Sequence, residues 1–213
     1  MPRTVFAHVE TWVFDLDNTL YPPAIRLFDQ IERRMTDYVL RALGVAAVEA
    51  DALRARYWTS YGTTLAGLMR EHGLDPAPYL DHVHDIDLSG VAPAPDLCAA
   101  LGRLPGRKVV YTNGSREHAR RVTRAIGLEG CFDALYGFED AAFVPKPEAE
   151  AFATVFALDG LVARRAAMFE DDHRNLAVPH RLGMRTVLVG PDSAHPHVQH
   201  QTEDLADFLG GVV

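Results

Sequence analysis

The stretch Phe14-Asp15-Leu16-Asp17-Asn18-Thr19-Leu20 decides the fold of this chain, because it ends a strand and begins a site. Residues 11–14, Thr-Trp-Val-Phe, have the β-branched and aromatic composition of a buried strand. Side chains alternate along a strand, so Asp15 and Asp17 are expected on one side of its end. Two carboxylates this close repel one another, and a divalent cation such as Mg²⁺ would relieve the repulsion. An ordinary acidic surface turn is the alternative for this stretch alone.

The composition is that of a soluble globular protein with an acidic surface. The chain has 213 residues, 48% hydrophobic and 23% charged, which fits one domain or a core domain with an insertion. A net charge of −8 argues against nucleic-acid and anionic-membrane partners, which need a basic face. Two cysteines without a framework, no signal-peptide pattern and no membrane-length apolar run predict a cytoplasmic protein.

Residues 22–88 are expected to form an all-helical insertion. From Ile25 apolar residues recur every three or four positions until Gly44, the pattern of an amphipathic helix and its stop. Similar patterns predict helices over residues 49–61, 64–72 and 78–84. No strand pattern interrupts them.

From Pro93 onward helical and strand patterns alternate. Strands are predicted at residues 108–111, 132–136, 166–169 and 186–189, with helices between them and a last helix near 202–209. Strands separated by single helices form parallel β-α-β units, which predicts an α/β fold with a doubly wound parallel sheet. We therefore expect a Rossmann-like catalytic core at residues 1–21 and 89–213, with a small helical cap domain at residues 22–88.

The carboxyl ends of three predicted strands carry residues suited to chemistry. Asp15 and Asp17 follow the first, Thr112 follows the second, and residues 170–172 (Glu-Asp-Asp) follow a later one. In doubly wound sheets ligands bind beyond the carboxyl ends of the strands, where the strand order reverses. These ends are therefore predicted to meet in one crevice, with the cap over it as a lid.

With these residues in place, the chain resembles the haloacid dehalogenase-like superfamily of phosphotransferases. Four motifs stand in that superfamily's order: Asp15-Leu16-Asp17-Asn18-Thr19, Thr112-Asn113-Gly114, Lys146 between two prolines, and Glu170-Asp171-Asp172. Over nearly the whole chain the sequence is also similar to the pyrimidine 5′-nucleotidase branch. That similarity rests on Asp15 to Pro22, Tyr61 to Leu65, Val83 to Asp87, Pro105 to Lys108, Phe143 to Pro147 and Met168 to Leu176.

The resemblance implies a two-step phosphoryl transfer. Asp15 would be the nucleophile that forms an aspartyl-phosphate, and Asp17 would serve as general acid and then as general base. Dehalogenases of this family typically lack an acid two residues after the nucleophile, and this chain has one.

Mg²⁺ is the cofactor that the resemblance implies. Its ligands would be Asp15, the backbone carbonyl of Asp17, and Asp171, because magnesium takes few protein ligands and keeps several waters. Further residues would hold metal-bound waters or orient the loop: Glu170, Asp172 and Asn175. A solvated acidic turn is the alternative for residues 170–172.

The substrate phosphate would be bound by two side chains and by the chain around them. Thr112 would donate a hydrogen bond to a phosphoryl oxygen, and Lys146 would neutralise its developing charge. Backbone groups near these ends would help: Leu16, Asn113 and Gly114. Residues 112–114 also read as an ordinary turn with Ser115 as N-cap, and a lone lysine is ordinarily solvated.

The expected function is hydrolysis of a small phosphate ester, with a pyrimidine nucleoside 5′-monophosphate such as UMP or CMP as the implied substrate. One alternative is a sugar-phosphate or phosphoglycolate phosphatase, and another is a silent phosphoryl-binding or regulatory protein. Fold-level similarity does not fix the substrate.

Other residues are weaker candidates. Arg116 and His118 fall where substrate could reach them but are expected to be exposed helical residues. Three histidines, His195, His197 and His200, lie in a polar tail, expected to be solvated rather than a metal site. Aromatic residues of the insertion could stack on a base but are expected to be core: Tyr57, Trp58 and Tyr61.

Overall fold

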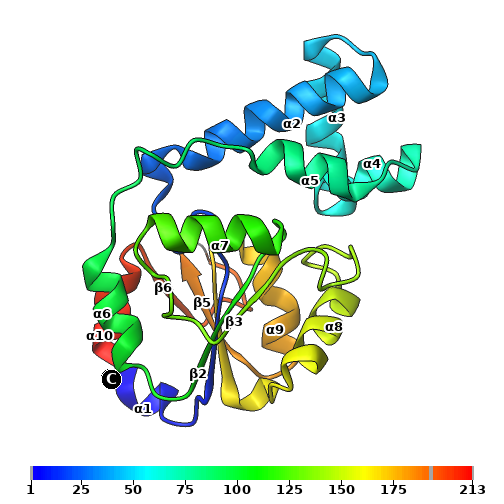
Figure 1. Cartoon of the computed structure of the whole chain (residues 1–213). Coiled ribbons are helices and arrows are strands. Elements are labelled where there is room, and N and C mark those ends of the chain that lie inside the picture. Colours follow the sequence, from blue (N-terminus) through cyan, green and yellow to red (C-terminus); the bar gives the residue numbers. More distant parts are fainter. Residues whose placement is uncertain (1, 192–193, 213) are drawn as a thin grey trace.

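A parallel sheet of six strands forms the centre of the computed structural model, which describes residues 2–191 and 194–212 (Figure 1). The strand order is β3-β2-β1-β4-β5-β6, and every neighbouring pair is parallel. The chain builds one half of the sheet outward from β1, then returns to place β4 on the other side of β1. This reversal between β1 and β4 is the switch point of a doubly wound sheet, as predicted. The strands are β1 (Thr11–Phe14), β2 (Arg107–Tyr111), β3 (Ala134–Tyr136), β4 (Ala166–Glu170), β5 (Arg185–Val189) and β6 (His200–Thr202).

Strand β1 is buried on both faces, which explains why its four residues show no polar alternation. Trp12 and Phe14 pack into the core on one face, and Val13 packs into the core on the other. The Phe14 ring stacks on Phe169 of β4 with centroids 4.7 Å apart. The indole N–H of Trp12 donates to the carbonyl of Pro105 at 2.7 Å. These contacts fix the strand that delivers the first acids of the site.

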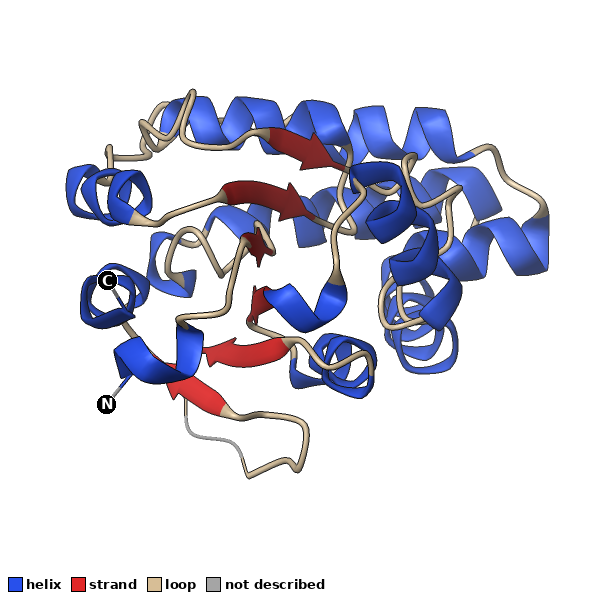
Figure 2. Ribbon diagram, turned by 90° about the horizontal axis from the view of Figure 1, so that it is seen from below, coloured by secondary structure: helices blue, strands red, loops and turns tan. Residues whose placement is uncertain are grey.

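Helices cover both faces of the sheet (Figure 2). One core holds residues of α1 (Pro2–Phe6), α6 (Pro95–Arg103), α7 (Arg116–Ala125) and α10 (Leu205–Val212). The core of the opposite face holds residues of α8 (Ala149–Asp159) and α9 (Ala177–Arg181). Short 3-10 turns occur at η1 (Pro23–Ile25), η2 (Ala163–Arg165) and η3 (His173–Leu176).

Residues 22–88, here called the helical insertion, hold no strand and lie beyond the carboxyl ends of the central strands (Figure 1). They contain α2 (Leu27–Leu43), α3 (Ala47–Tyr61), α4 (Thr64–His72) and α5 (Pro76–His84), which confirms the all-helical insertion after the first strand. Gly44 ends α2 at φ 66°, a left-handed conformation that glycine adopts without strain. The Thr63 side chain caps α4 by accepting a hydrogen bond from the Ala66 amide.

Hydrogen bonds join the segment that enters the insertion to the segment that leaves it. Gln30 exchanges two hydrogen bonds with the backbone of Asp87, each 3.0 Å long. Arg121 of α7 donates to the carbonyl oxygens of His84 and Ile86, at 2.8 and 3.1 Å. Helix α7 therefore binds the segment through which the chain returns from the insertion to the sheet.

Two elements were not predicted from the sequence. The edge strand β6 is three residues long and polar, so it shows no strand pattern, yet it pairs with β5. Helix α1 is only five residues long. The predicted core ranges also include residues 1, 192, 193 and 213, which lie outside the described residues. Within the described ranges, no helix has the length and apolar character needed to cross a membrane.

Candidate active site

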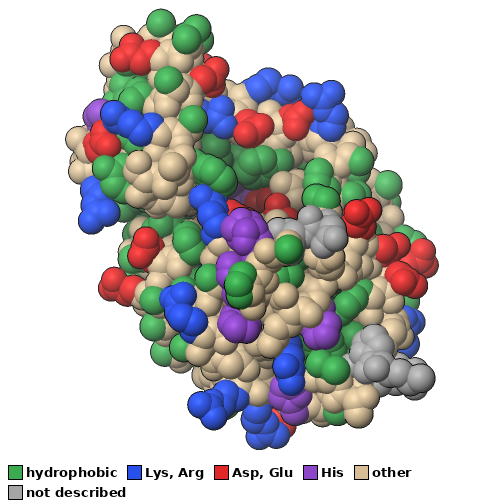
Figure 3. All heavy atoms as spheres, turned by 180° about the vertical axis from the view of Figure 1, so that it is seen from behind, with side chains coloured by type: hydrophobic (Ala, Val, Ile, Leu, Met, Phe, Trp, Pro, Cys, Tyr) green, Lys and Arg blue, Asp and Glu red, His purple; other side chains and the backbone are tan. Residues whose placement is uncertain are grey.

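A cavity of about 970 Å³ lies between the strand ends and the helical insertion, and Figure 3 shows it as a hollow between the two parts. The predicted site residues that line it come from several separate segments. They are Asp15, Asp17, Thr112, Asn113, Gly114, Lys146, Glu170, Asp171, Asp172 and Asn175. Leu16 does not line the cavity, because its side chain is buried in the core.

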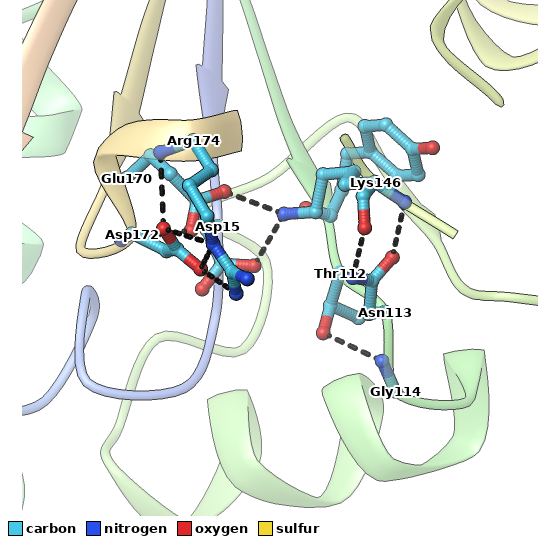
Figure 4. Close-up of polar contacts among 9 residues, drawn as sticks. Asp15, Thr112, Asn113, Gly114, Lys146, Glu170, Asp172 and Arg174 are labelled. Atoms are coloured by element: carbon cyan, nitrogen blue, oxygen red, sulfur yellow. Dashed lines mark hydrogen bonds and ion pairs between the residues drawn. The ribbon is translucent and has the colours of Figure 1, made fainter. Parts of the chain in front are cut away.

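Lys146 is the electrostatic centre of the site (Figure 4). Its side chain is 1% exposed, and its Nζ lies 2.6 Å from Asp15 Oδ1 and 2.6 Å from Glu170 Oε2. The same Nζ donates to the Tyr111 carbonyl at 3.0 Å. Burial alone would lower the pKa of Lys146, but the two carboxylates outweigh burial and raise it, so the ammonium stays charged. The predicted convergence of Lys146 with Asp15 is thus present in the geometry.

Three acids gather around a common point. Asp15, Glu170 and Asp171 each offer a carboxylate oxygen, and these oxygens lie within 4.8 Å of one another. Burial raises the pKa of Asp15 and holds that of Glu170 well above its ordinary value. Burial, and to a smaller extent the negative charge of Asp15, raises the pKa of Asp171 to about 7. When all three acids are ionised, Lys146 neutralises only one, and two negative charges remain.

This donor set fits a magnesium ion. It offers hard carboxylate oxygens, and its uncompensated charge matches that of a divalent cation. Glu170 is already engaged, since one of its oxygens binds Lys146 and the other accepts a 3.3 Å hydrogen bond from the Asp172 amide. Asp171 and the second oxygen of Asp15 are the groups best placed to hold the ion.

Asp172 faces a different partner. Its carboxylate accepts hydrogen bonds from the backbone amide of Arg174 and from the guanidinium, at 3.0 Å and 2.5–3.1 Å. The Arg174 guanidinium lies 3.6 Å from the ring centroid of Trp58 in α3, which links the insertion to this loop. Asn175 is buried, and its amide donates to the Asp172 carbonyl at 3.0 Å. The pairing with Arg174 explains why the pKa of Asp172 is lowered despite burial.

Asp17 is held by a hydroxyl and an imidazole. Tyr21 Oη donates to Asp17 Oδ1 at 2.6 Å, and His118 Nε2 lies 2.9 Å from the same oxygen. Burial would raise the pKa of Asp17, but the charge and hydrogen bond of His118 and the bond from Tyr21 outweigh it and lower the pKa. The His118 ring stacks on His84 of α5, with centroids 4.2 Å apart.

The expectation that His118 is exposed was wrong, because its side chain is 1% exposed. A signal was available: His118 lies one helical turn before Val122, on the buried face of α7. His84 was not singled out as a site residue, since it lies in the insertion and meets α7 only through the tertiary fold.

The turn after β2 positions Thr112 and Lys146. Thr112 Oγ1 accepts a 2.9 Å hydrogen bond from the Gly114 amide, so its hydroxyl hydrogen is free to point elsewhere. The Asn113 side chain pairs with the Lys146 backbone through bonds of 2.8 and 3.1 Å. Ser115 caps α7 by accepting from the His118 amide. Because the Gly114 amide already has an acceptor, its direct contact with phosphate stays a prediction.

The weaker candidates separate into core and surface. Tyr57 is buried in the core of the insertion, as expected, whereas Trp58 is 51% exposed beside Arg174. Tyr61 donates to Glu71 at 3.0 Å. Arg116 is exposed and paired with Asp140.

The expectation of a solvated tail was wrong for His195 and His197, which stack with His173. His200 lies apart from them, in β6, and packs against Phe6 with ring centroids 5.1 Å apart.

Comparison with known proteins identifies the class that this fold and site define. The family model of haloacid dehalogenase-like hydrolases matches residues 9–183, and the chain belongs to this hydrolase family. Phosphate metabolism protein 8 of Saccharomyces cerevisiae is 26% identical over 181 residues, covering 78% of this chain. The match spans only 56% of the yeast protein, so this chain corresponds to little more than half of it.

Solved structures share the fold at low identity. CbbY of Rhodobacter sphaeroides, in complex with phosphate, has a TM-score of 0.63 at 20% identity, and the match covers 93% of this chain and 96% of the CbbY chain. The HAD-hydrolase YfnB of Bacillus subtilis, bound to magnesium, has a TM-score of 0.61 at 17% identity, with coverages of 96% and 98%. L-2-haloacid dehalogenases share the fold too, at 15% and 18% identity. These likenesses extend to the fold alone.

Proposed function

We propose that this protein is a Mg²⁺-dependent phosphomonoesterase that works through an aspartyl-phosphate on Asp15. The observation that carries the proposal is the buried Lys146, bonded to Asp15 and Glu170, with the acid Asp171 beside them. We assign residues 1–21 and 89–213 to the catalytic core and residues 22–88 to a cap. Two proteins of this fold, one bound to magnesium and one in complex with phosphate, support the same chemistry.

Asp15 is the nucleophile in this proposal. Its carboxylate oxygen attacks phosphorus, the bond from phosphorus to the leaving oxygen breaks, and the leaving oxygen takes a proton from Asp17. In the second step Asp17 takes a proton from water, the water oxygen attacks phosphorus, and the bond to Asp15 breaks. Phosphate leaves, and Asp17 holds a proton again.

The environment of Asp17 is suited to proton transfer but favours the carboxylate in the ligand-free protein. Hydrogen bonds from Tyr21 and His118 lower its pKa. A bound phosphate dianion would act in the opposite direction, because a nearby negative charge favours the protonated form. His118 and Tyr21 also fix the orientation of the carboxyl group.

The phosphoryl group would be held by Lys146, Thr112 and the chain around them. Lys146 offers a fixed positive charge, and Thr112 offers a hydroxyl hydrogen oriented by the Gly114 amide. Mg²⁺, held by Asp15, Asp171 and the Asp17 carbonyl, would neutralise phosphoryl charge and attract the substrate. Glu170 would act through Lys146 by fixing its ammonium.

The substrate that we propose is a pyrimidine nucleoside 5′-monophosphate. The cavity volume is in the range typical of drug-sized ligands, and the wall that the insertion contributes combines apolar side chains with charged ones such as Asp51 and Arg54. The resemblance to the nucleotidase branch supports this choice, and the name of the yeast relative connects that protein with phosphate metabolism. We place the activity in the cytoplasm, in keeping with the free thiols of Cys98 and Cys131.

A panel of phosphate esters tests the function. Purified protein is assayed with an aryl phosphate, UMP, CMP, sugar phosphates and phosphoglycolate, with Mg²⁺ and with EDTA, and Asp15→Asn is the control. We expect Mg²⁺-dependent hydrolysis with a preference for UMP or CMP. A preference for a sugar phosphate or phosphoglycolate would replace the nucleotide assignment. Absence of hydrolysis at every pH would favour the silent binding protein.

Dehalogenation is the second candidate, because L-2-haloacid dehalogenases share the fold. The acid Asp17, positioned by Tyr21 and His118, favours phosphate-ester cleavage over dehalogenation. Halide release from a 2-haloacid, in the absence of phosphatase activity, would reverse this preference.

A further inference from the structure

Three histidines from two segments converge beside the cavity. His173 opens η3, directly after the acidic residues 170–172, and His195 and His197 come from the segment between β5 and β6. One nitrogen of each imidazole lies within 4.8 Å of the others. Ring centroids are 3.6 Å apart for His173 and His195, and 5.5 to 5.7 Å apart for the pairs with His197. Histidine side chains gather at the rim of the hollow in Figure 3.

Two nitrogens of this cluster lack a partner. Among the described residues, His173 Nδ1 and His197 Nε2 are buried and accept or donate no hydrogen bond. A buried polar atom without a partner costs about 1–3 kcal/mol, and such atoms are rare in native proteins. Two such atoms in one cluster of three imidazoles are available to bond a ligand through nitrogen.

The segment that carries His195 and His197 is anchored to the sheet. Thr186 Oγ1 in β5 donates to the His197 carbonyl at 2.7 Å, and the Thr186 amide donates to Gln199 at 3.2 Å. Residues 195–198 form a turn, in which the Val198 amide donates to the His195 carbonyl at 3.0 Å. The two histidines are therefore presented toward His173 by a segment that is hydrogen-bonded to β5.

We propose that His173, His195 and His197 form a binding site for a transition-metal ion, with Zn²⁺ or Co²⁺ as the fitting ions. Imidazole nitrogen is a preferred ligand of these ions, whereas Mg²⁺ prefers oxygen. Three histidine ligands leave a fourth tetrahedral position for water or another group. The histidine site and the acidic site thus select different metals by their donor atoms.

The imidazole rings must turn and their nitrogens must approach one another to hold the ion. Zinc binds imidazole nitrogen at about 2.0–2.1 Å, which places tetrahedral ligand atoms about 3.3 Å apart. A metal ion lies in the plane of each imidazole that binds it, so the His173 and His195 rings, now stacked 3.6 Å apart, must turn out of their parallel arrangement to bind one ion. The bound ion clamps the segment before β6 to the loop that carries Asp171 and Arg174.

The test is a titration of chelator-treated full-length protein with Co²⁺ in a large excess of Mg²⁺, which occupies the acidic site. We expect one equivalent of Co²⁺, with the visible absorption bands of nitrogen coordination. The double variant H195A/H197A is expected to bind Co²⁺ at least about tenfold more weakly, since losing ligands costs no less than losing an outer-shell partner. The variant H200A, which alters a histidine outside the cluster, is the matched control and is expected to bind as the wild type does.

A second measurement covers the case in which the double variant is poorly folded. Zn²⁺ is expected to raise the unfolding temperature of the wild type and of H200A. A wild type that shows neither Co²⁺ absorption bands nor a Zn²⁺-dependent shift in unfolding temperature would overturn the proposal. Co²⁺ binding that is equal in wild type and in a folded H195A/H197A would overturn it as well.

Discussion

Lys146→Met tests whether the buried ammonium holds the two carboxylates of the site. The side chain of Lys146 is 1% exposed, and its Nζ makes 2.6 Å contacts with both Asp15 and Glu170. Removing one partner of a buried ion pair costs about 3–5 kcal/mol, because it leaves an uncompensated charge. Methionine keeps the volume but not the charge, and the stranded acids take up protons. The expected loss is therefore about 3–5 kcal/mol in all, out of a typical 5–15 kcal/mol.

The loss of stability should depend on pH. Burial raises the pKa values of Asp15 and Glu170 in the folded protein, and loss of the ammonium raises them further. An acid whose pKa is raised on folding stabilises the protein below its unfolded pKa and loses that contribution as pH rises through the folded pKa. The difference between wild type and Lys146→Met is therefore expected to be large at about pH 8 and small at about pH 5.

Urea unfolding of the metal-free proteins, followed by circular dichroism at both pH values, measures this difference. The chain has one other lysine, and Lys108→Met is the matched control. Among the described residues, Lys108 Nζ donates to two backbone carbonyls, at 3.1 and 3.3 Å, and to no carboxylate, so its loss is expected to cost about 1 kcal/mol or less at either pH. Equal stability of Lys146→Met and wild type at about pH 8, or a loss that does not change with pH, would refute the reasoning.

Three further predictions address the metal, the insertion and the cavity wall. A Mg²⁺ ion bound to Asp171, whose pKa is about 7, would displace its proton, so Mg²⁺ affinity by calorimetry should fall about tenfold per pH unit below that value. Asp171→Asn should bind Mg²⁺ more weakly and show a smaller fall, because Asp15, whose pKa is also raised, remains. In Gly67→Ala the new Cβ would overlap the Tyr57 ring, so the free energy of unfolding in urea should fall by about 1–3 kcal/mol. In the control Gly102→Ala the Cβ lies in open space on a helix, so the free energy of unfolding should rise by about 0.5–1 kcal/mol, and equal effects of the two changes would contradict this packing. The buried Tyr79 hydroxyl lies beside the Thr64 side chain at the cavity wall, so Tyr79→Phe should cost about 1 kcal/mol or less in urea unfolding but should raise KM for the preferred substrate. An unchanged KM would remove Tyr79 from substrate recognition.

The sequence was sufficient for the parts of the site that depend on strand ends. Asp15 follows β1, Glu170 is the last residue of β4, and these two strands pair directly, so parallel topology alone brings the acids together. Lys146 carried a weaker signal, since a lone lysine is ordinarily solvated, and the order of the motifs was needed to place it.

The remaining features depend on contacts that no local pattern records. His84 and His118 lie in the insertion and the core, and they stack only because α5 returns beside α7. Asp172 looks like a third metal acid in the sequence, but Arg174 binds its carboxylate. The strand β6 is short, polar and at the sheet edge, where hydrophobic periodicity gives no signal.

Trapping the covalent intermediate on Asp15 is the decisive measurement. In Asp17→Asn the base for the second step is absent, while an aryl phosphate has a leaving group that needs no acid, so the intermediate should accumulate. The variant is mixed with an aryl phosphate and Mg²⁺, quenched in acid and digested, and the peptides are sequenced by mass spectrometry. The expected result is one phosphoryl group on Asp15. Release of phosphate without a phosphoryl group on Asp15, or with the group on another residue, would contradict the proposed mechanism.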